Sequence, residues 1–380
     1  MNVINQQPAE KRCIAFVIEA LTVGGAEQML VAMANRFSDR GWEVHMICLT
    51  SAGELADQLF PAINVHLGHK QPGIDVGLAV RLRRIINRIK PDVINSHLWT
   101  ANLWTRLALP FGSRPVFVTE HSRDTWKKTH ERFIDRLLAL WTNKLVAVSH
   151  DTADFYRSTV HIPDRQIVVI NNGIDTGAYQ QGDGARIRAE FSIPADTFLI
   201  GTVGRLVPAK NHGRLLEMAT RLKPRLNNFR VLLVGDGEGR DQLTASIKAQ
   251  QLQDVVIMAG ARQDIGNVLA ALDVFVLSSD REGHPLTALE AQTAGTPVVL
   301  TNAGGSADAI AGYRDSDSPA AAMTGGLLVE KSGEALADAV LSLAQDPTRL
   351  QAMGEFAREY APDGFSLEQM VSRYEDLFLS

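Results

Sequence analysis

Two glutamates in the stretch 278–300 carry the first chemical signal of the chain. Glu282 follows an apolar run at 273–277, and Glu290 comes eight residues later. Eight residues of one α-helix overshoot two full turns by about 80°, so one helix would not turn both carboxylates to the same side. If Glu282 lies in a loop and Glu290 one turn into the next helix, both can face one pocket and bind sugar or ribose hydroxyls. A solvated loop glutamate beside a helix-surface glutamate is the open alternative.

The residues around these glutamates predict a strand, a loop and a helix. Pro285 fits the first helical position, where its missing N–H is no loss, and Gly295 fits the helix end before a strand from Pro297. This layout aims backbone N–H groups and the positive end of a helix dipole at the carboxyl edge of a sheet. An anionic ligand suits such a place.

A second loop places two cations near a helix start. Arg205 and Lys210 follow the apolar stretch 198–204, and a helix is expected from about Gly213. A guanidinium fork together with an ammonium suits a diphosphate. A surface ion pair is the alternative, but both cations belong to the sheet edge that also carries Glu282 and Glu290.

The amino-terminal half shows weaker signals. Gly24 and Gly25 lie between a strand at 13–20 and a helix at 26–40, where a ligand could approach the backbone, although a plain tight turn explains them equally well. They do not form the G-x-G-x-x-G pattern, so binding of NAD is not supported. His97 and His121 each end a strand. We expect a structural hydrogen-bonding role for His97 and a functional role for His121.

These residues need two α/β domains to position them. Strands alternating with helices along the whole chain predict parallel sheets, and 380 residues exceed one comfortable core. The boundary is expected near 175–190, where turn-forming and glycine-rich residues gather. A last amphipathic helix is predicted at 366–379.

Composition excludes some classes of protein. The chain is 45% hydrophobic and 21% charged with a net charge of −5, so nucleic acid is not an obvious partner. Residues 1–170 hold 20 Lys and Arg against 16 Asp and Glu, whereas the remainder holds 18 against 27. Cys13 and Cys48 lack zinc or redox spacing and are expected to be buried, reduced thiols.

Localisation is expected to be cytoplasmic. The first twelve residues contain no apolar segment of a signal peptide, and no apolar run approaches the ~20 residues that span a bilayer. Basic stretches at 81–90 and 127–136 usually form solvated faces, but together they could dock on anionic lipid at the inner face of the cytoplasmic membrane.

The ordered set of motifs resembles glycosyltransferase family 4, whose members are retaining enzymes of the GT-B fold that use nucleotide sugars. The resemblance spans nearly the whole chain. Its strongest part is Arg205 and Lys210 together with the E-x7-E pair Glu282 and Glu290. It also includes Gly24-Gly25-Ala26-Glu27, His121, the turn 172–175, the loop Gly235-Asp236-Gly237 and Gly304-Gly305.

The resemblance implies an α/β architecture of two Rossmann-like domains whose parallel sheets face each other across a cleft. Residues 1–175 would bind the acceptor, residues 176–362 the nucleotide sugar, and residues 363–380 would form a helix crossing back to the first domain. A retaining hexosyltransferase of this kind would move a hexose or N-acetylhexosamine, most often from UDP, to a glycan or lipid-linked acceptor in surface polysaccharide or lipopolysaccharide synthesis.

The resemblance also assigns roles to single residues. Arg205 and Lys210 would neutralise the diphosphate, Glu290 would hold the ribose, Glu282 the sugar hydroxyls, and His121 would touch the donor sugar near the reacting carbon. Further nucleotide-sugar contacts would come from Gly24, Gly25, Gly204, Gly235, Asp236, Gly237, Arg262, Gly283, His284, Pro285, Leu286 and Thr287. His284 stands at a variable position, and Asp308 replaces a longer glutamate of many members, which leaves a side-chain contact from its loop in question.

The chemistry follows from these charges. Fixed cations and a helix dipole can stabilise a departing diphosphate without a metal ion, so we expect that neither a metal ion nor a cofactor is needed. Without a strong protein nucleophile, we expect a front-face transfer in which the leaving phosphate accepts the acceptor's proton. The alternatives are a UDP-sugar 2-epimerase of the same fold and a non-catalytic scaffold subunit.

Overall fold

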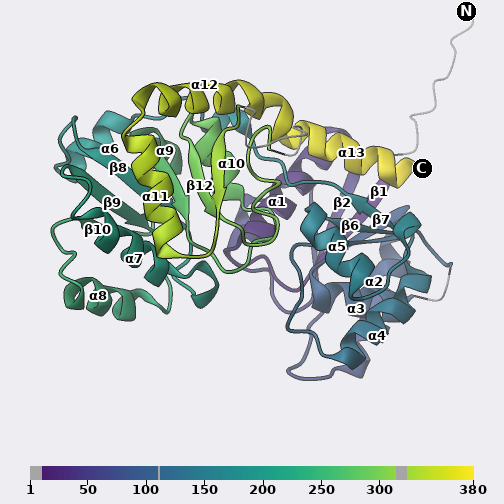
Figure 1. Ribbon diagram of the computed structural model, residues 1–380. Helices are drawn as coiled ribbons and strands as arrows, with labels where there is room; N and C mark the ends of the chain where they lie inside the picture. The colour runs from purple at the N-terminus through teal and green to yellow at the C-terminus, as the bar shows by residue number, and fades with distance from the viewer. Residues whose placement is uncertain (1–10, 110–111, 314–322) are drawn as a thin grey trace, which may run out of the picture. The chain divides into compact units, whose positions relative to one another are not determined.

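The computed structural model describes residues 11–109, 112–313 and 323–380 (Figure 1). The amino-terminal stretch used to judge a signal peptide therefore lies almost wholly outside the described residues. Contacts divide the chain into two compact units. Unit 1 comprises the residues up to Asn171 with Met370–Ser380, and unit 2 comprises Asn172–Gln369.

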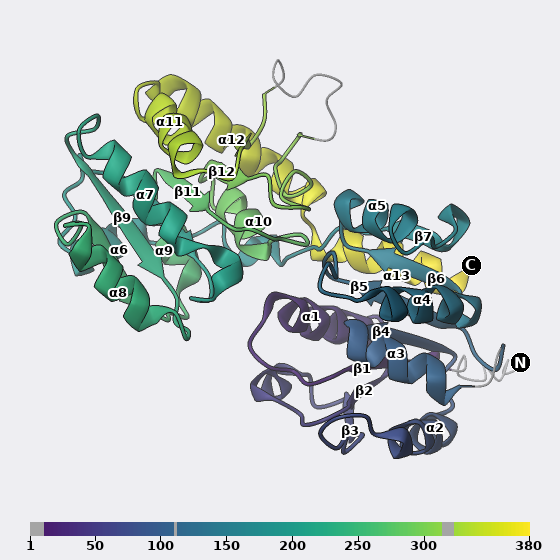
Figure 2. The same cartoon turned by 60° about the horizontal axis from the view of Figure 1, so that its bottom comes forward.

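Unit 1 is a seven-stranded, wholly parallel sheet in the order β3-β2-β1-β4-β5-β6-β7. Every residue of β1, β4 and β5 is buried, as expected for parallel strands with helices on both faces (Figure 2). The elements up to Asn171 are β1 (Cys13–Ile18), α1 (Gly25–Asp39), β2 (Glu43–Cys48), η1 (Glu54–Gln58), β3 (Asn64–Leu67), α2 (Val76–Ile89), β4 (Val93–His97), α3 (Trp99–Ala108), β5 (Val116–Glu120), α4 (Thr129–Leu138), η2 (Ala139–Trp141), β6 (Lys144–Ala147), α5 (His150–Ser158), η3 (Asp164–Gln166) and β7 (Ile167–Val169).

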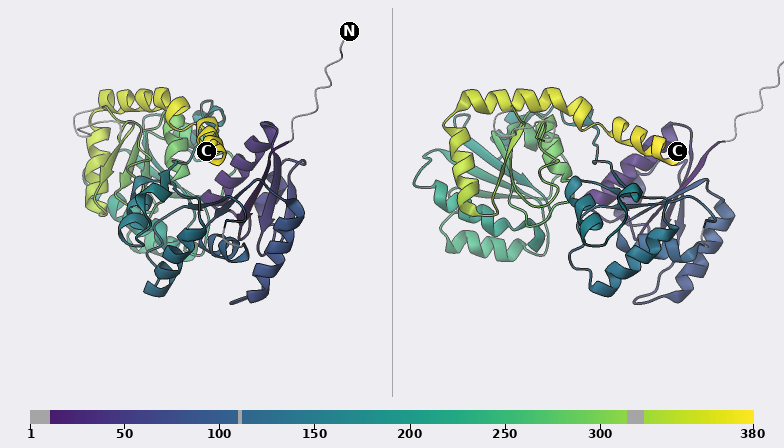
Figure 3. Two further views of the ribbon diagram at one scale, coloured as in Figure 1. Left: turned by 90° about the vertical axis from the view of Figure 1, so that its right-hand side faces the viewer. Right: turned by 45° about the vertical axis from the view of Figure 1, so that its right-hand side comes forward.

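Unit 2 contains a six-stranded parallel sheet in the order β10-β9-β8-β11-β12-β13 (Figure 3). Successive residues of β9 alternate between two apolar cores: Val231 and Leu233 join one, and Leu232 and Val234 join the other. Its elements are η4 (Thr176–Ala178), α6 (Gly184–Glu190), β8 (Phe198–Val203), η5 (Pro208–Lys210), α7 (His212–Leu222), β9 (Phe229–Val234), α8 (Arg240–Ala249), β10 (Val256–Gly260), α9 (Ile265–Ala271), β11 (Val274–Leu277), α10 (Leu286–Thr293), β12 (Val298–Thr301), β13 (Gly326–Val329), α11 (Gly333–Ala344) and α12 (Pro347–Gly364).

Both sheets reverse their strand order once. The chain adds strands on one side of β1 and then returns to its other side at β4, and unit 2 repeats this at β8 and β11. Such a reversal opens a crevice at the carboxyl ends of the two central strands, where open α/β sheets bind ligands. The topology thus places one candidate crevice in each unit.

The last helix, α13 (Leu367–Leu379), adds its residues from Met370 onward to unit 1. The Tyr374 hydroxyl lies 3.4 Å from Thr119 Oγ1, and the Phe378 ring packs on Phe37 and Phe117. Phe378 completes the buried face, whereas the neighbouring Leu377 is only partly buried.

Candidate functional site

The loops after β8 and β11 are fastened together at the reversal point of unit 2. The Asp280 N–H donates to Ala209 O at 2.8 Å, and the Ser278 hydroxyl donates to Lys210 O at 3.0 Å. Asn211 Nδ2 also donates to Asp280 Oδ2 at 3.0 Å. These bonds bring the predicted phosphate-binding loop beside the predicted sugar-binding loop.

Glu282 and Lys210 meet in this fastened region. Glu282 Oε1 accepts from Lys210 Nζ at 2.7 Å and from Ser279 Oγ at 2.5 Å. The Glu282 backbone N–H donates to Ala303 O, and its carbonyl oxygen accepts from the Gly305 N–H. The loop after β12, which contains Gly305, therefore holds Glu282 in place. An ammonium group has three donors, and the bond to Glu282 leaves two of them for a ligand.

Arg205 is the exposed cation of the pair. Its side chain projects from the loop after β8, and no partner for its guanidinium is found among the residues that the structure describes. Gly204, just before it, lies beside Lys210: a Cβ there would come 3.8 Å from Lys210 Cε. Both predicted phosphate ligands therefore belong to one short loop.

Gly235 and Gly237 are required by close approach to that loop. A Cβ at Gly235 would lie 1.9 Å from the Gly204 carbonyl oxygen, and one at Gly237 would lie 2.7 Å from the Leu206 carbonyl oxygen. Asp236 accepts from the Leu206 N–H through its backbone and pairs with Arg240 through its side chain. The glycines thus pack the two loops together, which is a structural reason for their presence.

Glu290 is buried on α10. Its carboxylate accepts a hydrogen bond from the Tyr179 hydroxyl at 3.0 Å. Burial raises the pKa of Glu290 to about 7, against the smaller effect of that bond. Sequence reasoning missed Tyr179, because a tyrosine 111 residues away in the chain gives no signal in pattern or spacing.

The start of α10 carries the other predicted ligands. Pro285 caps the helix, which begins at Leu286, one residue later than predicted, and Thr287 follows in its first turn. The first four N–H groups of a helix lack partners within it and mark its positive end. Gly283 and His284 precede this turn. The His284 ring is held at 3.1 Å from the Asp308 carbonyl oxygen, so the loop of Asp308 makes its contact through the backbone.

Arg262 is already engaged. Its guanidinium binds Glu190 at 2.6 and 2.9 Å and Asp264 at 2.8 and 2.9 Å, and it lies over the Phe191 ring. These bonds occupy all three nitrogens. Arg262 thus links the end of α6 to the start of α9 through ion pairs. Its contact with a nucleotide base stays a prediction.

In unit 1, the loop after β1 holds Gly24 and Gly25. Gly24 caps α1 with an extended backbone that any residue adopts, and Gly25 is the first helical residue. A Cβ at Gly24 would meet the flexible Glu27 carboxylate at 2.3 Å. The fold therefore does not explain these glycines, and their predicted phosphate contact stays a prediction.

His121 forms a hydrogen-bonded chain with two residues of β4. Asn95 Nδ2 faces the Phe117 carbonyl oxygen, so its Oδ1 must be the atom that faces His97 Nε2 at 2.7 Å. His97 Nε2 therefore carries the proton, and His97 Nδ1 accepts from His121 Nε2 at 3.0 Å. Burial lowers the pKa of both rings, that of His121 to about 4, so His121 is neutral and its Nδ1 is an acceptor. His97 has the predicted structural role.

This chain gives a spectroscopic prediction. In ¹⁵N-resolved NMR of the intact protein near neutral pH, His121 should show the protonated-Nε2 tautomer. The variant His97→Phe removes the acceptor, and His121 should then populate both tautomers. A wild-type spectrum with protonated Nδ1 at His121 would contradict the assignment.

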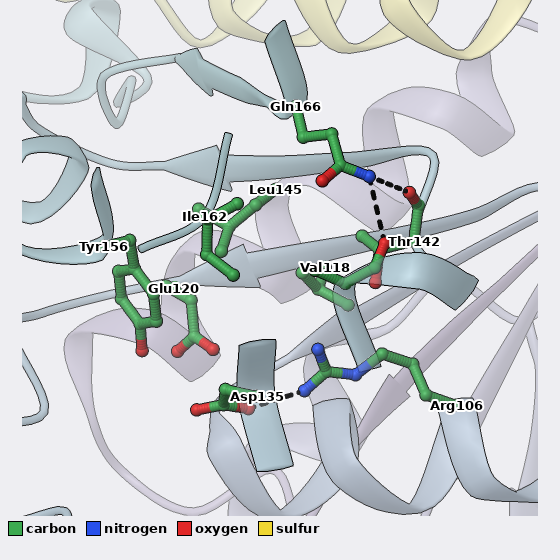
Figure 4. A pocket seen from close by; sticks show the side chains of 10 residues that line it. Arg106, Val118, Glu120, Asp135, Thr142, Leu145, Tyr156, Ile162 and Gln166 are labelled. Carbon is green, nitrogen blue, oxygen red and sulfur yellow. Dashed lines mark hydrogen bonds and ion pairs between the residues drawn. The ribbon is translucent and has the colours of Figure 1, made fainter. Parts of the chain in front are cut away.

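Lys127 corrects the prediction of a second basic surface stretch. Its side chain is completely buried, and its ammonium lies 2.7 Å from Asp135 and 2.8 Å from Asp124. Arg106 binds the other oxygen of Asp135 at 2.8 Å, and Glu120 lies 4.0 Å from Lys127. Figure 4 shows Glu120, Asp135 and Tyr156 pointing toward one another around a small cavity. In the sequence, Lys127 looks like one more member of the run of cations that continues with Lys128 and Arg132, although its side chain belongs to a buried charge cluster.

Two further features concern metals and membranes. Among the described residues, Cys13, Glu43 and His45 bring possible metal-donor atoms within 4.8 Å of one another, at the strand starts and hence at the edge opposite the His121 end. Within the same residues, no helix is long and apolar enough to cross a bilayer.

Comparison with known proteins identifies the family. Residues 23–178 match the model of Glycosyltransferase Family 4, and residues 183–360 match that of Glycosyl transferases group 1. A D-inositol 3-phosphate glycosyltransferase of Kineococcus radiotolerans is 34% identical, over 89% of this chain and 86% of the relative. The UDP-Gal:alpha-D-GlcNAc-diphosphoundecaprenol alpha-1,3-galactosyltransferase of Escherichia coli is 23% identical over 96% of each chain.

Solved structures agree on the fold. Anabaena Alr3699/HepE, crystallised with UDP, superposes with a TM-score of 0.81 at 20% identity, covering 96% of this chain and 98% of that one. With the two parallel sheets, this neighbour confirms the predicted GT-B fold. The chain belongs to glycosyltransferase family 4, and the protein is a glycosyltransferase.

Proposed function

We propose that the protein transfers a hexose or N-acetylhexosamine from a UDP-sugar, with retention of anomeric configuration, to a glycan or lipid-linked acceptor of a surface polysaccharide. The observation that carries the donor assignment is the pairing of Lys210 with Glu282 at the reversal point of unit 2, with Arg205 on the same loop as Lys210 and the start of α10 directly after the loop of Glu282. Two cations and a helix dipole suit a diphosphate, and carboxylates beside them suit hydroxyls.

The geometry supports a mechanism based on leaving-group stabilisation. As the bond from the sugar to the diphosphate breaks, negative charge grows on the phosphate oxygens. Arg205, Lys210 and the N–H groups at the start of α10 would stabilise that charge from fixed positions. We infer that the reaction needs no metal ion or cofactor, and that the departing phosphate takes the proton of the acceptor hydroxyl as the new bond forms on the same face.

The names of related proteins support the donor and acceptor classes. The Anabaena structure contains UDP, and the E. coli relative is named for transfer from UDP-Gal to a diphosphoundecaprenol-linked sugar. Because family membership shows a glycosyltransferase, the epimerase and scaffold alternatives are not retained. Binding of the acceptor by unit 1, with contact to a membrane surface from the cytoplasm, completes the proposal.

Glu290 gives a pH prediction for nucleotide binding. If this carboxylate holds the ribose hydroxyls, it accepts hydrogen bonds from them best when ionised, so UDP affinity should rise as pH increases through about 7, the pKa of Glu290. In Glu290→Gln this component should be absent. Isothermal titration measures the UDP affinity of both proteins from acid to alkaline pH. Because the ionisation of UDP affects both proteins equally, it drops out of the difference between them. Parallel pH profiles of affinity would contradict the role of Glu290 in holding the ribose.

The stability of the folded protein should depend on the ionisation of Glu290 in the opposite direction to UDP affinity, falling as pH rises. The folded-state pKa of Glu290 is raised, so the folded protein holds this proton more tightly than the unfolded chain. The stability it contributes is complete below the unfolded pKa of a glutamate and is lost as pH rises through about 7. Bound ribose should offset part of this loss.

A donor screen tests the proposed function. Thermal unfolding of the intact protein is measured with UDP-, GDP-, ADP- and CDP-sugars, because a ligand that binds only the folded state raises its melting temperature. We expect UDP-sugars to give the largest shift and Arg205→Ala to abolish it. A larger shift with another base would correct the donor, and no shift with any nucleotide would overturn the proposal.

A further inference from the structure

Helix α4 of unit 1 turns its apolar side outward. Phe133 and Leu137, four residues apart on one face, are 58% and 45% exposed, whereas Asp135 on the opposite face is buried. Surface helices of globular proteins normally show the reverse arrangement. The inward side is explained by the ion cluster, because Asp135 binds Arg106 and Lys127. The outward side needs a different explanation.

The apolar surface extends beyond the helix itself. The described residues contain fifteen large, exposed apolar side chains, and five of them lie within 126–140. Trp126 precedes α4, and Leu140, the most exposed of the five at 64%, follows it. The fifth is Ile134. We call Trp126, Phe133, Ile134, Leu137 and Leu140 the α4 patch (α4 is labelled in Figures 1 and 2).

The fully exposed charges of the α4 segment are positive. They belong to Lys128 and Arg136. Of the carboxylates in the α4 segment, Asp135 is buried, and Glu131 is only partly exposed and caps its own helix by accepting from the Lys128 N–H at 2.6 Å. Exposed apolar side chains gathered on one helix and its flanks, with cations among them, are typical of a helix that lies in the interface of an anionic bilayer.

We propose that the α4 patch inserts into the headgroup region of an anionic membrane. The apolar side chains enter the boundary of the acyl chains, Trp126 sits at headgroup depth, and the long stems of Lys128 and Arg136 carry their charges to lipid phosphates. This membrane insertion rests on the proposed function. It adds the surface of unit 1 that would bring the enzyme to a lipid-linked acceptor.

The charges favour a membrane over a second copy of the chain. In a twofold dimer through the α4 patch, the same surface would face itself. Lys128 and Arg136 of each copy would then oppose cations, and no exposed carboxylate on α4 could pair with them. An anionic lipid surface satisfies both the apolar side chains and the cations.

Vesicle sedimentation tests the insertion. The intact protein is mixed with phosphatidylcholine vesicles with and without phosphatidylglycerol, at low and high salt. We expect binding to require phosphatidylglycerol at low salt and to weaken only partly at high salt, because screening removes the ionic attraction but not the apolar contact. Complete loss of binding in high salt would overturn insertion and leave a purely ionic contact.

Matched variants separate the α4 patch from general surface effects. The triple variant Phe133→Ser, Leu137→Ser, Leu140→Ser should lower the vesicle partition coefficient by about 10²-fold or more. The control triple, Phe60→Ser, Val65→Ser, Leu67→Ser, removes three exposed apolar side chains at and before β3, outside both basic stretches, and should leave binding unchanged. All six positions are exposed, so both triples should keep the wild-type unfolding temperature.

Three outcomes would overturn the proposal. They are unchanged binding of the α4 triple, equal loss in the control triple, and a wild-type dimer in sedimentation velocity that the α4 triple dissociates. Because vesicle binding needs no transfer, its failure would leave the donor screen and the proposed function untouched. A failed donor screen would likewise leave the membrane surface standing.

Discussion

Lys210→Ala is expected to lower kcat by about 10²-fold or more, since removal of one preorganised charge from a transition state commonly costs this much. The structure adds a second reason. Lys210 Nζ lies 2.7 Å from Glu282 Oε1, so the alanine variant would leave that carboxylate without a counter-ion beside the departing diphosphate. Its repulsion would grow as negative charge develops on the leaving group.

Two further variants make this prediction specific. Lys210→Arg keeps the charge near Glu282 and should retain much more activity than Lys210→Ala. Arg205→Ala should lose activity to a similar extent, although Arg205 has no partner among the described residues, because its predicted role is in the reaction and not in the fold. Initial rates of UDP release at saturating donor measure all three, and near-normal turnover of either alanine variant would refute the assigned roles.

Lys127→Met is expected to destabilise unit 1 by about 3–5 kcal/mol, the usual result of removing one partner from a buried ion pair. Burial by itself would lower the pKa of Lys127, but Glu120, Asp135 and Asp124 outweigh burial and hold that pKa above its ordinary value. Without the ammonium, three carboxylates and one guanidinium share a closed interior. The melting temperature of the corresponding transition should fall by about 10 °C.

The neighbouring residue provides the control. Lys128→Met removes the same charge from an exposed position and should change stability by less than about 0.5 kcal/mol. Calorimetry of the two variants compares them directly. Equal stability of Lys127→Met and Lys128→Met would show that the buried cluster contributes nothing to the fold.

The fold was predictable because its signals are local. Apolar strands such as 13–18 and 198–203, glycine helix ends such as Gly295, and alternating strands and helices all lie within short windows. Short or weakly patterned elements escaped prediction. Strand β3, for example, has no fully buried residue.

The sequence predicted the charged residues of the candidate site but not the residues that bind to them. Arg205, Lys210 and Glu282 follow strands directly, so the carboxyl edge of a parallel sheet collects them. The contacts of Glu290 with Tyr179 and of His121 with His97 depend on strands and loops packed across the sheet. Lys127 shows the same limit, because a charge that will be buried looks in sequence like its exposed neighbour.

Retention of the anomeric configuration during transfer is tested most directly by ¹H NMR of the glycoside formed from the UDP-sugar that the donor screen identifies. The site offers fixed cations for the leaving phosphate, which we propose takes up the acceptor's proton on the same face. This predicts an anomeric proton coupling that matches the configuration of the donor. A product with inverted configuration would contradict the proposed mechanism.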